Sequence, residues 1–184
     1  DPQICDCKMM SSRGKYFLCA IVLIAFNHFA QAQQQYEWDW SFSLDGRSIG
    51  MDDMAVDAAG NIYAGGTMHY SFNAPNDTIV PIRQGIQHSM LTKVTPKGHY
   101  SWTRLIESDA GTKIWGVACS NGYAYCALGT NRGNVYLNGD TLNCDDYGCG
   151  YILQYDPAGN LVQYLPLRNS LMFLSKIEHD YNGN

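Results

Sequence analysis

Short apolar segments alternate with clusters of turn residues along most of the chain. Segment 54–56 leads through turn residues 57–61 into segment 62–64, and segment 90–94 leads through Pro-Lys-Gly into segment 100–105. Apolar runs of this length, bounded by Gly, Pro, Asn and Asp, are typical of antiparallel strands joined as hairpins. No stretch after the first thirty-odd residues shows the sustained 3.6-residue apolar period of a helix. The pattern therefore predicts an all-β fold of short strands.

One phrase in this pattern recurs. The sequence Val-Asp-Ala-Ala-Gly-Asn-Ile-Tyr-Ala-Gly-Gly at 56–66 returns in altered form at 118–128, and its beginning returns at 180–184. Three aromatic residues recur at a spacing of about 62 residues, namely Trp40, Trp102 and Tyr164. Two further pairs of segments recur at nearly the same offset, namely 93–99 with 154–160 and 76–79 with 139–142. Such repetition indicates stacked supersecondary units, each too small to bury its own apolar face.

Each unit contains two hairpins and therefore four short strands, which is typical of a β-propeller blade. A β-sandwich would not require the same phrase in consecutive units, and a β-helix repeats at a much shorter period. We therefore expect β-propeller blades, as tandem four-stranded antiparallel sheets, over residues 33–184. Repeat 1 should cover about 36–105, repeat 2 about 106–167 and the start of repeat 3 about 168–184. The last segment specifies a strand that the sequence does not contain, so we expect an incomplete ring.

The repeated motif resembles a known family. Ile-x-x-Asp-x-x-Gly-Asn-Ile-Tyr-x-x-Gly, followed by a variable insert, a Pro-x-Gly turn and a Trp-bearing strand, is similar to the SBBP repeats of secreted bacterial β-propeller proteins, frequent in Bacteroidetes. Segment 54–102 matches closely, whereas 117–164 has Cys119 in place of the motif Asp and Tyr123 in place of its Asn. Segment 177–184 matches only the opening. NHL repeats share the turn phrase but have shorter units. The resemblance implies export, with surface attachment through a sorting domain of the type IX secretion system.

The N-terminal residues form a separate region in the sequence. Basic residues precede an apolar run at 16–26, and Ala30-Gln31-Ala32 provides a small-x-small cleavage signature before Gln33. We interpret residues 10–32 as a secretory signal peptide cleaved near Ala32, and 1–9 as an upstream, non-native extension. Translation would then start at Met9 or Met10. A membrane anchor is the alternative, but the run is shorter than the roughly 20 residues that span a bilayer. We expect a secreted or outer-cell-surface protein without a membrane span.

Composition agrees with a folded β domain. The chain has 184 residues, 46% of them hydrophobic and 12% aromatic, and a formal net charge of −5. These residues are sufficient to fill a core, and aromatic and β-branched side chains favour sheets. No basic tract is present, so the electrostatic attraction that dominates nucleic-acid binding is absent and nucleic acid is excluded as a partner. The expected partner is a protein or a glycan.

Four cysteines lie in the predicted mature region, and an even count in an exported chain permits disulfides. Cys144 and Cys149 could close a small loop. Cys119 and Cys126 flank an Asn-Gly turn and could pair as diagonal neighbours on a hairpin, or could remain as buried thiols that behave as small hydrophobes. Zinc is disfavoured because neither pair has the spacing of a zinc knuckle with a matching second pair.

Acidic residues suggest one metal candidate. Asp140, Asp145 and Asp146 form the densest acidic cluster, and calcium prefers oxygen ligands. A solvated loop is favoured over calcium because Asp140 recurs as Asp77 and no calcium-loop motif is present. Asp57 occupies a turn position, where a carboxylate accepts backbone hydrogen bonds. We find no paired histidine spacing, nucleophile elbow or phosphate loop, so neither catalytic residues nor an organic cofactor is predicted.

Two of the tryptophans occupy a repeated position and one does not. Trp40 and Trp102 occupy equivalent repeat positions, which favours packing between neighbouring sheets. Trp115 has no aromatic counterpart and is the better candidate for stacking on a ligand such as a sugar.

The expected function is a non-catalytic scaffold or an interaction module for proteins or glycans. The alternative is a fragment of a propeller enzyme, such as a lyase, a glycosidase or a quinone-dependent dehydrogenase, with its catalytic residues in other blades. Non-repeated carboxylates, histidines or arginines at inner-strand ends would favour the enzyme. The repeats could also simply space other domains along a surface protein.

Overall fold

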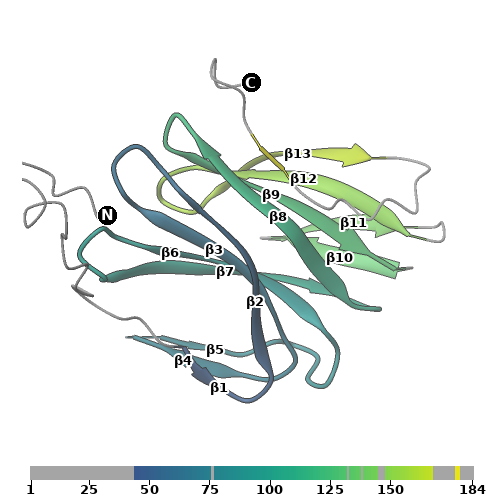
Figure 1. Cartoon of the computed structure of the whole chain (residues 1–184). Helices are drawn as coiled ribbons and strands as arrows, with labels where there is room; N and C mark the ends of the chain where they lie inside the picture. Colours follow the sequence, from purple (N-terminus) through teal and green to yellow (C-terminus); the bar gives the residue numbers. More distant parts are fainter. Residues whose placement is uncertain are drawn as a thin grey trace, which may run out of the picture. The chain divides into compact units, whose positions relative to one another are not determined.

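The computed structural model describes residues 44–75, 77–131, 133–137, 139–144, 148–167 and 177–178. In this part of the chain all regular structure is β-strand and every strand pairing is antiparallel (Figure 1), which confirms the all-β prediction. None of these residues belongs to a helix that could cross a bilayer. The predicted extension 1–9, the signal peptide 10–32 and nearly all of 168–184 lie outside the described residues. The strands are β1 (Asp45–Gly46), β2 (Ile49–Val56), β3 (Ile62–Met68), β4 (Phe72–Ala74), β5 (Asp77–Ile79), β6 (His88–Val94), β7 (Tyr100–Ser108), β8 (Thr112–Ser120), β9 (Tyr123–Thr130), β10 (Gly133–Leu137), β11 (Asp140–Cys144), β12 (Cys149–Tyr155) and β13 (Leu161–Leu167).

Two four-stranded meanders form the body of the molecule. The first meander has the order β2-β3-β6-β7, and the second has the order β8-β9-β12-β13. In each, a hairpin is followed by an inserted second hairpin, β4–β5 or β10–β11, and then by the remaining two strands. None of the three sheets formed by the described strands is closed on itself.

The two meanders share irregularities as well as strand order. The pairing of β2 with β3 shifts between Met51 and Asp53, and that of β8 with β9 shifts between Ile114 and Gly116. The outer strand pairs shift at matching places too, between Lys93 and Val94 in the first meander and between Gln154 and Tyr155 in the second. A β-bulge bends a strand and is a specific feature of a fold. Bulges at equivalent positions therefore show that the sequence repeat is also a repeat of strand pairing.

The strand register corrects two sequence equivalences. Trp102 lies opposite Lys93, and the residue in that place of the second meander is Gln163, opposite Gln154. Tyr164 is thus one position away, and a slip of one residue transfers a side chain to the other face of a sheet. Trp102 is 6% exposed and Tyr164 is 43% exposed, so their predicted equivalence is wrong. Trp40 lies outside the described residues.

The second correction concerns the turn motif. Val56 pairs with Ile62, and Cys119 occupies the corresponding place opposite Ala124. The position of the motif Asp is therefore taken by Ser120, not by Cys119. The cause is loop length: an Asn-Gly turn of two residues closes the β8–β9 hairpin, where the β2–β3 hairpin uses a longer turn.

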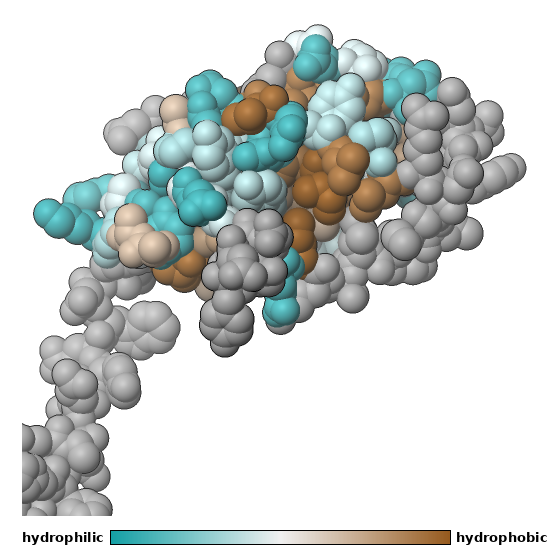
Figure 2. Space-filling view, turned by 90° about the horizontal axis from the view of Figure 1, so that it is seen from above, coloured by the Kyte–Doolittle hydropathy of each residue, from teal (hydrophilic) through white to brown (hydrophobic). Residues whose placement is uncertain are grey.

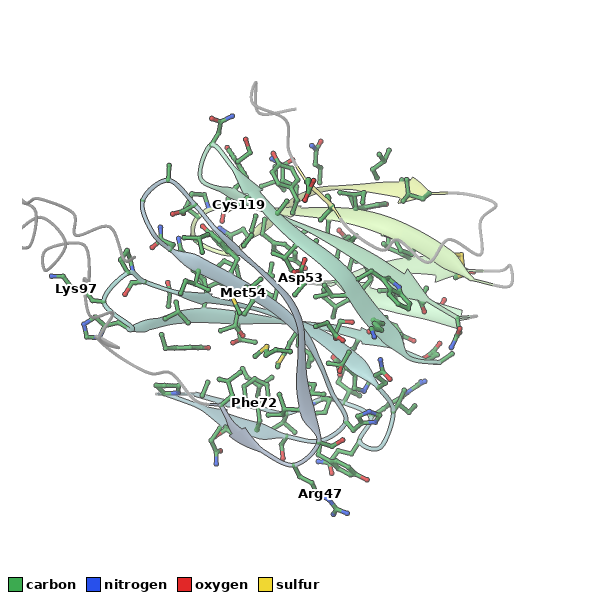
Figure 3. The ribbon with its side chains drawn as sticks, in the orientation of Figure 1. Arg47, Asp53, Met54, Phe72, Lys97 and Cys119 are labelled. Atoms are coloured by element: carbon green, nitrogen blue, oxygen red, sulfur yellow. A yellow bond between two sulfur atoms is a disulfide. The ribbon has the colours of Figure 1, made fainter. Side chains whose placement is uncertain are left out.

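The meanders pack face to face around one apolar core, with β8 lying across β2 and β3. Gly65 of β3 lies in this contact, where an added Cβ would be 2.6 Å from Val117 Cγ2. A second, smaller cluster lies between the first meander and the β4–β5 hairpin, where Phe72 is buried (Figure 3). The buried members of the main core are Tyr63, Leu91, Trp102, Ile106, Ile114, Val117, Cys119, Ala124, Cys126, Leu128, Val135, Leu137, Leu142, Tyr151, Leu153 and Tyr155.

The inserted hairpins connect to outer strands. The β10–β11 hairpin adds to the edge of β7, which extends the first sheet to six strands. The β4–β5 hairpin pairs with β1, the short strand that precedes the first meander.

Candidate functional site

The turn carboxylates have structural partners. Asp57 Oδ1 accepts hydrogen bonds from the backbone N–H groups of Ala59 at 3.0 Å and Asn61 at 2.8 Å, and its Oδ2 accepts one from Asn61 Nδ2 at 2.8 Å. Burial raises the pKa of this carboxyl, but the hydrogen bonds from Asn61 and Ala59 outweigh it and leave the pKa below 3.8. Asp156 accepts the same pair of bonds from Asn160. These geometries agree with the predicted turn role.

The contact between the meanders combines aromatic packing with hydrogen bonds. Trp102 packs between Tyr63 and Tyr155, with ring centroids 6.1 and 6.4 Å away. Lys93 Nζ and Trp102 Nε1 donate to the carbonyl oxygen of Pro157 at 3.0 and 3.1 Å. Arg104 donates to the next two carbonyls of the same turn. Strands β6 and β7 of the first meander thus bind the turn between β12 and β13 of the second, and Trp102 packs between the two sheets as expected.

Trp115, the candidate for ligand stacking, lies in the bulge of β8 and is half-buried. Its indole lies against Gly129 of β9, where an added Cβ would be 2.4 Å from Nε1. Lys113 Nζ lies 4.7 Å from the indole centroid and 3.2 Å from Asp52 Oδ1. Beside this ion pair, Asp53 Oδ2 accepts a 2.8 Å hydrogen bond from the Val117 N–H and bridges β2 and β8 (Figure 3).

We define the β2–β8 site as Asp52, Asp53, Lys113 and Trp115. It combines a half-buried aromatic ring with hydrogen-bond donors and acceptors of both charges, and the side chains come from the first strands of the two meanders. An aromatic ring flanked by polar groups is suited to recognising a polar ligand that also has an apolar face. The groups of the site that could take part in acid–base or nucleophilic chemistry are the carboxylates of Asp52 and Asp53 and the ammonium group of Lys113.

The four cysteines among the described residues form one disulfide and two free thiols. A disulfide joins Cys144 to Cys149, with the Cα atoms 5.8 Å apart, as the spacing suggested. Cys119 and Cys126 are free and buried, which corrects the second disulfide in favour of the buried-thiol alternative. Cys119 lies opposite Ala124, so the two cysteines are diagonal neighbours, whose Cα atoms lie about 7–8 Å apart in antiparallel sheets. That exceeds the usual Cα separation for a disulfide.

Only one residue of the predicted calcium site is among the described residues. Asp140 opens β11 and is exposed, whereas Asp145 and Asp146 lie outside the described residues. Within the described ranges no group of three or more His, Cys, Asp or Glu could hold a metal ion. Calcium binding at this loop therefore stays a prediction.

Sequence reasoning missed the polar centre formed by Asp109. This carboxylate accepts hydrogen bonds from Tyr136 Oη at 2.9 Å and from the backbone and side chain of Asn134, and it forms an ion pair with Arg83. The hydrogen bond from Tyr136 is the main cause that lowers the pKa of Asp109. The residue thereby joins the β7–β8 loop to β10 and to the loop before β6. A single Asp in a turn carries no local signal of such distant partners.

Comparison with known proteins assigns no family to the chain. No protein-family model matches it, and no curated protein matches it significantly. The resemblance of segment 54–102 to SBBP repeats therefore stays a prediction, and a functional assignment depends on the geometry.

Proposed function

We propose that the chain is a secreted repeat region of β-propeller type, similar to SBBP repeats, that acts as a non-catalytic scaffold and interaction module. One observation carries the proposal: two meanders with the same strand order and bulge positions pack face to face. A unit that buries its apolar face only against the next unit is built for stacking. Stacked sheets of this kind present their loops and inner strands as a binding surface.

The ligand class that fits the β2–β8 site best is a glycan. A pyranose ring has an apolar face that stacks on an indole, and its hydroxyl groups donate to carboxylates and accept from ammonium groups. Trp115 supplies the ring, the Lys113 ammonium lies over the face of that ring, and Asp52 pairs with Lys113 as the second polar partner. Since these residues lie at the joint of the two meanders, the ligand would contact both repeats.

A glycan-array experiment tests this function. The chain, labelled at its N-terminus, should retain a defined set of glycans, and Trp115→Ala should weaken their binding at least tenfold. Trp115→Phe keeps an aromatic ring and should bind within about threefold of the parent, which separates loss of stacking from loss of folding. Tyr164→Ala, at an exposed aromatic of β13, is the matched control and should change nothing. Absence of binding at millimolar glycan, or binding unaffected by Trp115→Ala, would contradict the proposal.

Export is tested separately. The predicted leader is fused to a reporter enzyme that is active only after export, and the mass of the secreted product is measured. We expect cleavage after Ala32, which leaves Gln33 as the new N-terminus. A reporter that stays inside the cell, or stays uncleaved in the membrane fraction, would contradict secretion.

A further inference from the structure

The ammonium group of Lys113 occupies a position in the β2–β8 site that suits the ammonium group of a ligand. Its Nζ lies 4.7 Å from the centroid of the Trp115 indole and 3.2 Å from Asp52 Oδ1. An aromatic face attracts a cation through the quadrupole of the ring, and a carboxylate attracts it through charge and hydrogen bonds. The protein's own side chain thus shows that the site accommodates an ammonium group.

Both groups that hold this ammonium belong to β-bulges. Asp52 has no opposite residue in the pairing of β2 with β3, and Trp115 has none in the pairing of β8 with β9. A bulge redirects a side chain and is frequent beside binding sites. Because the two bulges occupy equivalent positions of the two meanders, a carboxylate of one sheet and an indole of the other reach the same cation.

The site carries more negative than positive charge. Asp53 adjoins Asp52, and its Oδ2 accepts a hydrogen bond from the uncharged N–H group of Val117 at 2.8 Å. Lys113 forms its ion pair with Asp52, so two carboxylates share one ammonium group in the β2–β8 site. The excess of negative charge attracts a cationic ligand and repels an anionic one.

Lys113 can leave its position at low cost. Its side chain is 39% exposed and that of Asp52 is 23% exposed. An ion pair this close to solvent contributes little to stability, because water screens the charges and two flexible side chains lose entropy. A ligand that supplies another ammonium group, together with a ring for the indole, would therefore displace Lys113.

The ligand needs an ammonium group and an apolar ring face in one small unit. In a 2-amino sugar the ammonium is bonded directly to the pyranose ring, so the ring can stack on Trp115 while the ammonium pairs with Asp52. A lysine of a protein partner carries its ammonium at the end of a flexible stem and offers no ring. Apolar and hydrophilic areas lie directly beside each other on the face of the molecule in Figure 2, which agrees with a ligand of mixed character.

We propose that the β2–β8 site binds a glycan of 2-amino sugars whose amino groups are free and protonated, and that Lys113 fills the ammonium position until the ligand displaces it. The inference rests on the glycan binding proposed above and names the class of glycan. Lys113 is then a resident competitor of the ligand, and its removal should strengthen binding.

Two oligosaccharides separate the contribution of charge from that of stacking. One is an oligomer of glucosamine with free amino groups, and the other is its fully N-acetylated counterpart with the same length and linkage. Both present the same pyranose ring, but only the first carries ammonium groups. The full chain is titrated with each oligomer in a calorimeter. We expect about tenfold tighter binding of the amino oligomer, and this preference should decrease as salt is added.

Substitutions of Lys113 test the competition. Lys113→Met keeps an apolar stem and removes the resident ammonium, so it should bind the amino oligomer about fivefold more tightly than the parent. Lys113→Arg keeps a cation over the indole and should bind within about twofold of the parent. Lys97→Met removes a cation from the exposed turn before β7, which controls for the change in net charge, and should leave both affinities unchanged.

Asp52→Asn tests the carboxylate. The amide has nearly the same shape but no charge, so the preference for the amino oligomer over the N-acetylated one should fall to within about twofold. The ratio of two affinities, measured on one variant, is insensitive to the fraction of folded protein. Circular dichroism verifies that the variant folds.

Three outcomes would overturn the proposal: equal affinity for the two oligomers, weaker binding of the amino oligomer by Lys113→Met than by the parent, or a preference that persists in Asp52→Asn. A lysine-rich peptide that binds more tightly than the amino oligomer, and competes with it, would assign the site to a protein partner instead. If neutral glycans bind through Trp115 but the amino oligomer is not preferred, this inference fails and the proposed function stands. If no glycan binds, both fail.

Discussion

Gly65 offers a quantitative test of the packing between the two meanders. A Cβ added to Gly65 would lie 2.6 Å from Val117 Cγ2 and 2.8 Å from Ile114 Cγ2, well inside ordinary carbon contact distances. Both neighbours are buried in β8 and cannot move into solvent. Overpacking of a core costs about 1–3 kcal/mol, and alanine recovers about 0.5–1 kcal/mol over glycine in a strand. Gly65→Ala should therefore lower the free energy of unfolding by about 1 kcal/mol, the centre of a range of about 0–2.5 kcal/mol.

Gly50 in β2 is the matched control. A Cβ there would meet only Thr67 Oγ1, at 3.5 Å, which is an ordinary contact. Gly50→Ala keeps the gain in strand propensity without the clash. It should be neutral or stabilising by up to about 1 kcal/mol.

A double-mutant cycle identifies the clash. Val117→Ala alone removes two methyl groups from the core, each worth about 0.8 kcal/mol, and should cost about 2 kcal/mol once the cavity is included. In Gly65→Ala/Val117→Ala the new methyl occupies part of that cavity, so the loss should be smaller than the sum by at least about 1 kcal/mol. The assay is urea unfolding followed by circular dichroism. Additive losses, or a Gly65→Ala chain as stable as Gly50→Ala, would refute the face-to-face packing.

Three further predictions concern charge and sulfur. The hydrogen bond from Tyr136 lowers the pKa of Asp109 from 3.8, so this carboxylate contributes stability above the unfolded-state pKa that is lost as the pH falls through the folded-state pKa. Asp109→Asn should thus flatten the acid limb of the stability curve, measured as urea midpoints over a series of acidic buffers. Cys144→Ser should lower stability by about 2 kcal/mol, the loop-closure value for a short ring, and dithiothreitol should then have no further effect on melting. Burial raises the pKa of Cys126 to about 12, so an aromatic disulfide reagent should label this thiol only after unfolding, and fast labelling at Cys126 of the native chain, located by peptide mass, would contradict its burial.

Local chemistry made the strands and their turns predictable. The turn at 57–61 combines Asp, Gly and Asn in the order that a tight reversal requires, and Gly60 has the expected positive φ of 81°. The Asn-Gly turn closes the β8–β9 hairpin, with positive φ at Asn121 and Gly122. These features depend on a few neighbouring residues, so a single sequence contains them.

Register was not predictable to the residue. A constant offset of about 62 places Tyr164 at the position of Trp102, whereas the Pro-x-Gly turns, from Pro96 to Pro157, differ by 61. A bulge or a shorter turn changes the offset by one residue, and one residue is enough to exchange the two faces of a strand. The pairing of β10 with β7 is equally hidden, because it depends on an edge formed by residues distant in sequence.

Trp115 could be selected from the sequence because it breaks the repeat, but its surroundings could not. Lys113 and Asp52 lie more than sixty residues apart in the sequence and meet only because β8 packs across β2. No local pattern in either strand indicates that β8 packs across β2.

The aligned bulges explain why the β2–β8 site forms at the contact between the two meanders and is not repeated with the sequence. Lys113 occupies the register position of Gly50, and Trp115 occupies that of Asp52. If both meanders carried the β8 residues, a tryptophan would replace the carboxylate that pairs with Lys113, and if both carried the β2 residues, no cation would face Asp52. Positions that follow the repeat, such as Tyr63 and Tyr125, can serve the packing at every joint, whereas a recognition site needs positions that differ. The proposed glycan site therefore depends on positions at which the two repeats differ.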